Sequence, residues 1–340
     1  MLRKRAEAAT PLDGVDVLLA DLDGVVYTGP EAIPHAVDAL EGAAARGVRV
    51  GYITNNASRS DAVVAKHLAG FGLTVRPEDV VTSPQAAMRL LTAQLPEGAL
   101  VLVVGGEGLV TEVERAGFRI TRAAADGPDA VVQGFSPDIS WRELAEASFA
   151  LARDANGDGI PWIATNTDWT IPVAGGIAPG NGTLVSAVHT AVGILPQVAG
   201  KPETPIFEEA VRRFSASSPL FLGDRLDTDV LGARRAGIPS AHVLTGIDRA
   251  KQLLSAVPDQ RPDFLLEDLR QLSEPYPATV VKRDETIVGK ARVGIRDGRV
   301  EVRAEGERRI DLLRAACAAI WGSGLPIYAL DVPERLYSTR

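Results

Sequence analysis

Cysteine is almost absent from this chain of 340 residues, in which Cys317 is the only one. An intrachain disulfide is therefore excluded, and the composition fits a reducing cytoplasm. No segment reaches the ~18 apolar residues that a membrane-spanning helix needs, so we expect no membrane partner. A short basic run at residues 3–5 is followed by no apolar stretch, and it predicts neither a signal peptide nor an anchor.

Concentrated positive charge is also missing. The net charge is −8, and no stretch gathers Lys and Arg as a nucleic-acid groove would, so we expect no nucleic-acid partner. The four histidines are scattered and show none of the spacings that zinc sites use. What the chain does contain is 46% hydrophobic and 24% charged residues. That balance is typical of a folded protein with a full core, and the length predicts more than one domain.

Strands and helices alternate along both halves of the chain. Expected strands at residues 15–20 and 48–53 flank a helix at 34–46, which predicts a βαβ unit with parallel strands. The pattern resumes with a helix at 201–214 and a strand at 219–223, followed by a helix to 236 and short strands at 240–244 and 262–266. Residues 83–198 have an α/β rhythm of their own, and this stretch is long enough to be an inserted domain.

The last part of the chain predicts a separate unit. Alternating strands flank Asp297-Gly298, a dipeptide typical of a type I′ hairpin turn. A helix at 309–321 and a last strand at 325–330 follow. A proline-containing linker at 274–277 precedes the unit. We therefore expect a core formed by residues 1–82 and 199–273, an inserted domain at 83–198, and a C-terminal module at 278–340.

Two carboxylates stand two residues apart after the first expected strand. In a strand, Asp21 and Asp23 would point to the same side. Two like charges there repel each other unless a cation or a chemical task keeps them together. Gly24 lets the chain turn and approach a ligand closely. Taken alone, this motif is explained equally well by a polar turn at the end of a strand.

Three further signals change that balance. Thr54 follows the second expected strand, and Lys201 opens a helix. Asp224 and Asp229 follow the buried strand at 219–223. In open α/β sheets, ligands bind outside the carboxyl ends of the strands. We therefore expect all these residues to face one crevice, although they are far apart in the sequence.

The chemistry of these residue types fits phosphoryl transfer. Asp21, Asp23 and Asp224 would form an oxygen-rich acidic pocket that suits Mg²⁺. A cation lets Asp21 stay ionised and attack phosphorus, which gives an aspartyl-phosphate intermediate. Asp23 is then available to move a proton. The Thr54 hydroxyl and the Lys201 charge would position and neutralise the transferred group.

These motifs resemble those of a known family. DLDGV (21–25), Thr54, Lys201 and GDRLDTD (223–229) are similar to the four motifs of the haloacid dehalogenase (HAD) superfamily. The segments at 52–58, 164–172 and 179–184 resemble its subgroup with a large inserted cap, which holds 4-nitrophenyl phosphatase, phosphoglycolate phosphatase and NagD-like enzymes. The likeness runs over about residues 15–272. It implies an α/β fold with a Rossmann-like parallel-sheet core, an inserted α/β cap domain and a small C-terminal α+β module.

The resemblance also implies roles for single residues. Asp21 would be the nucleophile and Asp23 the general acid and base. Mg²⁺ would be held by the Asp21 carboxylate, the Asp23 backbone carbonyl and Asp224. Asp229 would orient metal-bound water from outside the ligand set. Phosphate or neighbouring substrate groups would be bound by Asn55 and Asn56.

A polar loop in the inserted domain is a candidate for substrate contact. Asn166, Asp168 and Trp169 lie in the loop at 165–182 and could reach the leaving group. Loop capping and packing between cap and core explain the same residues equally well. The sequence leaves these two interpretations open.

Residues 303–308, between a strand and a helix, resemble the pyrophosphate loop of GNAT-type acetyltransferases. Arg308 stands where that loop needs a small residue, and the module is less than half of a full acetyltransferase domain. We therefore expect no acetyl transfer. The module could pack on the core, contribute to a homodimer or sense a ligand. Removal of residues 275–340 is expected to leave the catalytic machinery chemically intact.

The predicted function is a Mg²⁺-dependent phosphomonoester phosphatase acting on a small phosphorylated metabolite. Relatives suggest glycerol phosphate or phosphoglycolate first, with pyridoxal phosphate or nucleotides behind them. A cap would close over the site and exclude water. Three alternatives remain. A dehalogenase would use Asp21 without Asp23 or Mg²⁺, a phosphomutase or phosphotransferase would act on sugar phosphates, and a regulator would sense a ligand through the C-terminal module.

Overall fold

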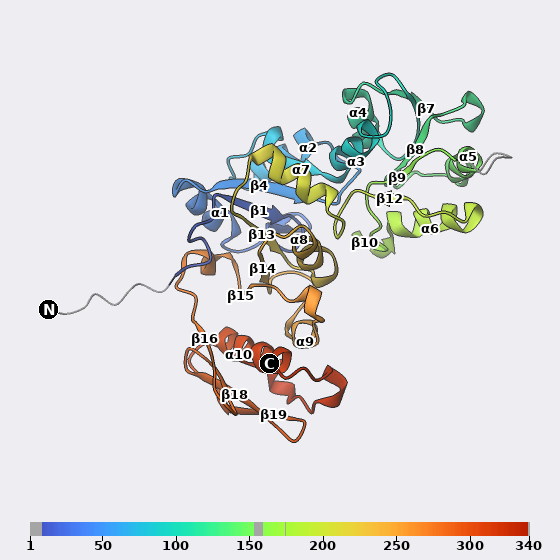
Figure 1. Cartoon of the computed structure of the whole chain (residues 1–340). Coiled ribbons are helices and arrows are strands. Elements are labelled where there is room, and N and C mark those ends of the chain that lie inside the picture. The colour runs from blue at the N-terminus through green and yellow to red at the C-terminus, as the bar shows by residue number, and fades with distance from the viewer. Residues whose placement is uncertain (1–8, 153–158, 174, 339–340) are drawn as a thin grey trace. The chain divides into compact units, whose positions relative to one another are not determined.

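The computed structural model describes residues 9–152, 159–173 and 175–338, coloured along the chain in Figure 1. These residues form two compact units. Residues 51–215 belong to the second unit, and the first unit is built from the segments before and after them. No helix among the described residues combines the length and the apolar composition needed to cross a membrane.

A parallel sheet organises the first unit. Its strands β1 (Val17–Asp21), β13 (Pro219–Gly223), β14 (Ser240–Val243) and β15 (Phe264–Leu266) lie in the order β15-β14-β13-β1. All of β1 is buried, as expected for a parallel strand covered on both faces. The remaining short elements of this part are β2 (Tyr27–Thr28), β3 (Glu31–Ala32), α1 (Ala36–Ala45), η3 (Leu226–Val230), α8 (Leu231–Arg235), α9 (Ala250–Leu254), η4 (Pro258–Gln260) and η5 (Leu269–Ser273).

The second unit begins within a strand. β4 (Arg49–Thr54) starts in the first unit, and in the second it pairs in parallel with β5 (Val80–Thr82). A second parallel sheet follows in the chain, with the order β12-β9-β8-β6-β7. Its strands are β6 (Leu100–Val104), β7 (Arg119–Thr121), β8 (Ala130–Gln133), β9 (Trp162–Ala164) and β12 (Gln197–Val198). This sheet accounts for the α/β rhythm expected between residues 83 and 198.

Helices and a hairpin complete the second unit. Apolar side chains of β6, β8 and β9 form a buried cluster with those of two helices, α5 (Trp141–Leu151) and α6 (Asn181–Val192). The other elements are α2 (Asp61–Gly70), η1 (Pro77–Asp79), α3 (Ser83–Thr92), α4 (Glu107–Arg115), η2 (Ala124–Asp126), the hairpin β10 (Thr170–Val173) with β11 (Gly176–Pro179), and α7 (Pro205–Phe214).

The helix that we expected to open at Lys201 begins four residues later. α7 has Thr204 as its N-cap residue and Pro205 at its first position. Proline is favoured there because its missing N–H has no partner in the first turn of a helix. Lys201 therefore lies in a turn before the helix.

The C-terminal module is an antiparallel sheet with one helix. β16 (Thr279–Val281), β17 (Thr286–Val288), β18 (Ala291–Arg296) and β19 (Arg299–Ala304) follow one another in chain order, and α10 (Arg309–Gly322) packs on them. Asp297 and Gly298 have φ angles of 50° and 74°. Both values are positive, as a type I′ turn requires, so the predicted hairpin is confirmed.

The predicted last strand at 325–330 is wrong. Those residues contain a single 3₁₀ turn, η6 (Ile327–Ala329), and a second turn, η7 (Glu334–Leu336), follows. Pro326 cannot donate to a strand partner, and its carbonyl instead accepts the Ala329 N–H at 2.9 Å. The apolar residues of this segment had favoured a strand that the backbone does not form.

The linker at 274–277 and the C-terminal module together cover the open edge of the parallel sheet. β15 is the edge strand, and the outward backbone groups of Leu265 are bonded to side chains. The Leu265 N–H donates to the Tyr276 hydroxyl at 3.0 Å, and the Leu265 carbonyl accepts from Arg314 at 2.6 and 2.9 Å. These two side chains take the place of a neighbouring strand, which removes the hazard of an exposed edge.

One hydrophobic cluster joins the module to the parallel sheet. It contains Leu226 and Val230 of η3 and Leu265 of β15, together with module residues such as Val293 and Ile310. The Trp321 indole N–H also donates to the Leu253 carbonyl at 3.1 Å. Of the three roles considered for the module, packing on the core is the one that the structure displays. Removal of residues 275–340 would therefore open this shared cluster, and whether the catalytic machinery stays chemically intact without the module stays a prediction.

Candidate active site

Two aspartates meet at the carboxyl edge of the parallel sheet. Asp21 is the last residue of β1, and Asp224 directly follows β13. The two strands are neighbours in register, with Ala20 opposite Leu222. Because parallel strands end at the same edge, residues more than 200 positions apart come together. Asp21 is 8% exposed and Asp224 is 1% exposed, so both carboxylates are largely removed from water.

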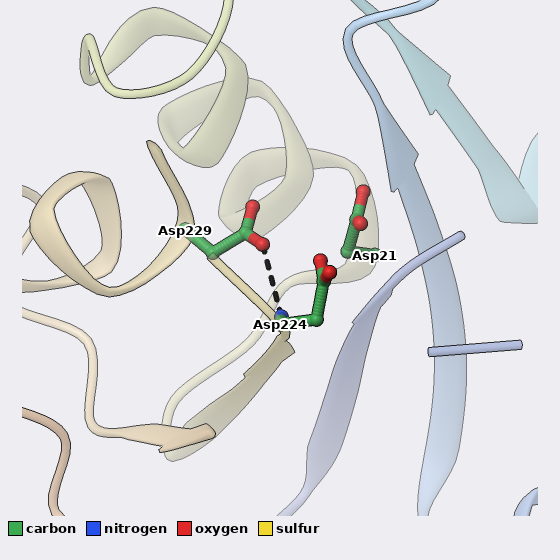
Figure 2. A group of neighbouring side chains, drawn as sticks. All are labelled: Asp21, Asp224 and Asp229. Carbon is green, nitrogen blue, oxygen red and sulfur yellow. Dashed lines mark hydrogen bonds between the residues drawn. The ribbon is translucent and has the colours of Figure 1, made fainter. Parts of the chain in front are cut away.

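A third carboxylate completes the group. Asp21, Asp224 and Asp229 each place one oxygen within 4.8 Å of the others, and all three residues are buried (Figure 2). Three like charges at this separation repel one another, and burial increases the cost. A bound cation would remove that cost. Three carboxylates with hard oxygen donors match what Mg²⁺ prefers, so this donor set fits the metal that the sequence motifs imply.

Asp229 also holds the backbone of its own loop. Its Oδ2 accepts the N–H groups of Asp224 and Arg225, both at 3.1 Å, and Figure 2 shows the first of these bonds. Gly223 makes this possible, because a Cβ atom there would lie 2.3 Å from the Cβ of Asp229. Asp229 thus holds the backbone at Asp224 in place through hydrogen bonds, a role that the sequence motif alone did not specify.

A loop that the sequence analysis passed over supports Asp224 from the other side. The Asp224 Oδ2 accepts the N–H of Ile247 at 2.6 Å. A Cβ atom at Gly246 would lie 1.9 Å from that oxygen, and one at Gly24 would lie 2.4 Å from it. Gly24, with a φ of 82°, therefore admits Asp224 as well as allowing the turn. The position of Gly246 just after β14 was the signal that could have found this loop.

Behind this loop lie two further titratable groups. The Asp248 N–H donates to the Asp224 carbonyl at 3.1 Å, and the Asp248 carboxylate accepts the Leu226 N–H at 2.7 Å. Burial raises the pKa of Asp248. His242 is fully buried, its Nε2 lies 3.0 Å from the Asp248 carbonyl, and burial lowers the pKa of His242 to about 4. A neutral imidazole therefore packs behind the carboxylate loop.

Asp23 differs from its neighbour Asp21. It is exposed, and β1 ends at Asp21, so the alternation rule for strands does not extend to Asp23. The chain turns here, because the N–H groups of residues 25–27 all point to the Leu22 carbonyl. The Thr245 hydroxyl donates to the Gly24 carbonyl at 2.7 Å and fixes the turn. An exposed carboxyl beside a buried one suits the proton-transfer role expected for Asp23.

The remaining candidates belong to the second unit. Thr54 ends β4 and is buried, and its Oγ1 accepts the Asn56 N–H at 3.1 Å. The Asn56 side chain accepts from the N–H and the hydroxyl of Ser58 at 2.9 and 2.8 Å. These bonds form the turn that follows the strand. That the two units present their residues to one crevice stays a prediction.

Asn55 gathers the other expected residues of that unit. Its side chain bonds to the backbone of Lys201 and to the Asp168 carboxylate, and its carbonyl accepts from Asn166 at 2.8 Å. Lys201 and Asn166 are each 4% exposed. Trp169, in contrast, is 66% exposed. The structure therefore brings Asn166 and Asp168 to Asn55, which also bonds to Lys201, whereas Trp169 is mostly exposed to solvent.

Comparison with known proteins identifies the family. Residues 18–119 match the haloacid dehalogenase-like hydrolase model, and residues 198–272 match a HAD-hydrolase-like model. D-glycerol 3-phosphate phosphatase of Mycobacterium tuberculosis is 41% identical over 314 residues, which cover 90% of this chain and 86% of that protein. The chain belongs to the haloacid dehalogenase-like hydrolases.

Other members of this hydrolase family share the fold. The crystal structure of a glycerol phosphate phosphatase from M. tuberculosis in complex with magnesium has a TM-score of 0.84 at 39% identity, covering 95% of each chain. A p-nitrophenyl phosphatase from Archaeoglobus fulgidus has a TM-score of 0.69 at 27% identity, covering 76% of this chain and 98% of that one. An acid sugar phosphatase of Staphylococcus aureus is 32% identical, covering 74% of this chain and 95% of that protein.

The C-terminal module has a relationship of its own. Residues 290–329 match a model described as a GCN5-related N-acetyltransferase-like domain. This agrees with the resemblance noted around residues 303–308. The matched stretch runs from β18 to η6 and includes the whole of α10.

Proposed function

We propose that this hydrolase is a Mg²⁺-dependent phosphatase of small phosphomonoesters, with glycerol 3-phosphate as its first candidate substrate. The observation that carries the proposal is the group of three buried carboxylates at the carboxyl ends of β1 and β13. Such a group is costly without a cation and suits phosphoryl transfer with one. The relative at 41% identity over 90% of the chain, named a D-glycerol 3-phosphate phosphatase, supports the choice of substrate.

Asp21 and Asp23 divide the chemistry between them. An oxygen of Asp21 attacks phosphorus, the bond from phosphorus to the ester oxygen breaks, and Asp23 gives its proton to the leaving alkoxide. Asp23 then takes a proton from water, whose oxygen attacks the aspartyl phosphate. Inorganic phosphate leaves and Asp21 is regenerated. Each step conserves charge and protons, and the two carboxyls return to their starting states.

The metal would be held by the carboxylates of Asp21 and Asp224 and by the backbone carbonyl of Asp23. When bound, Mg²⁺ supplies positive charge that offsets the carboxylates and the phosphoryl oxygens. Asp229 keeps the Asp224 loop in place through its two backbone bonds, and it would orient metal-bound water.

The second group of residues would bind the substrate. Lys201 would place a positive charge at the transferring phosphoryl group, and Thr54 and Asn56 would donate hydrogen bonds to its oxygens. Asn166, Asp168 and Lys201 all bond to Asn55, and this shared partner supports the proposal that Asn166 and Asp168 contact the alcohol part of the substrate. We further propose a cytoplasmic location, which fits the single buried Cys317, and a homodimer, which sedimentation would test.

The test is a screen of phosphate release across phosphorylated metabolites. The purified full-length chain would be assayed with glycerol 3-phosphate, phosphoglycolate, pyridoxal phosphate, nucleotides and hexose phosphates, with Mg²⁺ and with EDTA. We expect the highest kcat/KM for glycerol 3-phosphate and no turnover with EDTA. Equal turnover with EDTA, or conversion of a hexose phosphate into its isomer without phosphate release, would overturn the proposal.

A further inference from the structure

Hydrogen bonds from three separate segments converge on Asn55, contributed by Ser83, by the loop that holds Asn166 and Asp168, and by Lys201. Its Oδ1 accepts the Lys201 N–H at 2.8 Å, and its Nδ2 donates to the Lys201 carbonyl at 3.0 Å. The same Nδ2 donates to the Asp168 carboxylate at 3.1 Å. The backbone carbonyl of Asn55 accepts from the Ser83 hydroxyl at 2.7 Å and from Asn166 at 2.8 Å.

The pairing with Lys201 explains why the residue is asparagine. A side-chain amide carries one acceptor and two donors, and all three are used here. Two of these bonds join the amide to both backbone groups of one residue, so they fix the position of Lys201 in the chain. Aspartate offers no donor at neutral pH, and leucine offers neither donor nor acceptor. Only an amide of this length satisfies Lys201 and Asp168 together.

The surroundings are built to receive this amide. A Cβ atom at Gly200 would lie 2.6 Å from the Asn55 Oδ1 and 2.5 Å from the Thr165 carbonyl, so only glycine leaves the space. Ser83 and Lys201 stand at the two places where the chain is expected to enter and leave the inserted domain. Asn55 therefore bonds to a residue at each of these two places, and also to the polar loop of that domain.

We infer that Asn55 is a positioning residue, which acts on the phosphoryl group through Lys201 rather than by binding phosphate itself. The inference rests on the proposed function, in which Lys201 carries the positive charge at that group. The side-chain amide of Asn55 bonds to both backbone groups of Lys201 and to Asp168. Asn55 therefore fixes the backbone position from which the buried lysine side chain extends. It also ties that lysine to the loop proposed to contact the substrate alcohol.

The deciding experiment is a double-mutant cycle of Asn55→Ala and Lys201→Ala. Calorimetry would measure the binding of inorganic phosphate to each full-length variant with Mg²⁺ present, and kcat and KM for glycerol 3-phosphate would be measured in parallel. Hydrogen bonds to charged or buried groups support an effect of about 10- to 100-fold. We expect Asn55→Ala to weaken phosphate binding and to lower kcat/KM by that factor with Lys201 present, and by less than about 3-fold in the Lys201→Ala background.

Two further variants keep the result interpretable. Ser83→Ala removes only the hydroxyl that bonds to the Asn55 carbonyl, and we expect a loss of about 2- to 10-fold in phosphate affinity. Gln197→Ala removes an exposed side chain that bonds to Gln94 in the same unit, and it should leave phosphate binding unchanged. If Asn55→Ala does not fold, Ser83→Ala provides the test in its place, in the same cycle with Lys201→Ala.

The inference is overturned if Asn55→Ala weakens phosphate binding by the same factor in both backgrounds, because Asn55 would then contact phosphate independently. It is also overturned if neither Asn55→Ala nor Ser83→Ala changes phosphate binding. Failure of the proposed function would be a separate result. If the variants change phosphate affinity as expected but the wild-type chain hydrolyses no phosphomonoester, the phosphatase proposal is refuted. The role of Asn55 in positioning Lys201 would still stand.

Discussion

Two buried charged sites in the first unit differ in their electrostatics: neighbouring charges repel one another at one site and attract one another at the other. At the carboxyl edge of the sheet, Asp21, Asp224 and Asp229 place like charges within 4.8 Å of one another. At the edge strand β15, Arg314 is surrounded by partners of opposite polarity: the Asp311 carboxylate at 2.8 Å, the Leu265 carbonyl and the Gln271 side chain. Its guanidinium also stacks 4.2 Å from the centroid of the Tyr276 ring.

The difference separates binding chemistry from architecture. Around Arg314 the protein itself supplies every partner, so the group stabilises the fold and needs no ligand. Around the three aspartates like charges lie close together, in addition to the backbone N–H groups that Asp224 and Asp229 accept. Such a group of carboxylates suits a divalent cation, which would reduce the repulsion between them. Four substitutions or deletions test this contrast.

The largest effect is expected from the nucleophile. Asp21→Asn should lower phosphate release from glycerol 3-phosphate by at least about 1,000-fold, because an amide cannot form the aspartyl phosphate. The melting temperature should not fall, because one of three mutually repelling charges is removed. Asp227→Asn is the matched control, since Asp227 is exposed and paired with Arg225 at 2.8 Å. Activity of Asp21→Asn near the wild-type level would refute the mechanism.

Removal of the C-terminal module should affect folding next. A chain ending at residue 274 loses Tyr276 and Arg314, exposes the edge of β15 and opens the cluster that includes Leu226 and Val230. We expect it to be insoluble or to melt far below the full chain, as measured by pelleting and circular dichroism. A soluble truncation with an unchanged melting temperature would show that the module is a separate domain after all.

The contribution of Arg314 at the edge strand to stability can be tested by itself. Arg314→Met should reduce the free energy of unfolding by about 3–5 kcal/mol, because it leaves the buried Asp311 and the Leu265 carbonyl without their donor. Urea denaturation would measure this loss. Arg299→Ala, which breaks an exposed pair with Asp331, should cost less than about 1 kcal/mol. Equal losses in the two variants would contradict the structural role of Arg314.

The smallest effect is expected from replacing Asp229, whose side chain holds the backbone of the Asp224 loop. Asp229→Ala removes the acceptor for two backbone N–H groups at Asp224 and Arg225. Outer partners of metal ligands typically contribute 10- to 100-fold in metal affinity, so the Mg²⁺ concentration for half-maximal activity should rise by about that factor. Saturating Mg²⁺ should restore part of the rate. An unchanged Mg²⁺ dependence would mean that Asp229 does not act on the metal site.

Much of the fold follows from local patterns. The positions of β1, β13 and the inserted sheet were predicted from apolar runs, and the hairpin at Asp297 was predicted from its turn residues. The predictions that failed lie where proline decides the backbone: α7 begins at Pro205 and not at Lys201, and residue 326 prevents the last strand. Local composition is informative about strand and turn preference, and much less so about where a helix begins.

The sequence by itself determined the family, the residue types of the candidate site and their place at strand ends, because the order of parallel strands makes those ends meet. Only the tertiary structure decided which groups bond to one another. Three examples are the hydrogen bonds of Asn55 to the backbone of Lys201, those of Asp229 to the backbone of the Asp224 loop, and those of Arg314 to β15. Asn55 and Lys201 are 146 positions apart, and no local propensity encodes a hydrogen bond over that separation. Such bonds depend on how whole elements pack, which is why these three roles came from the structure.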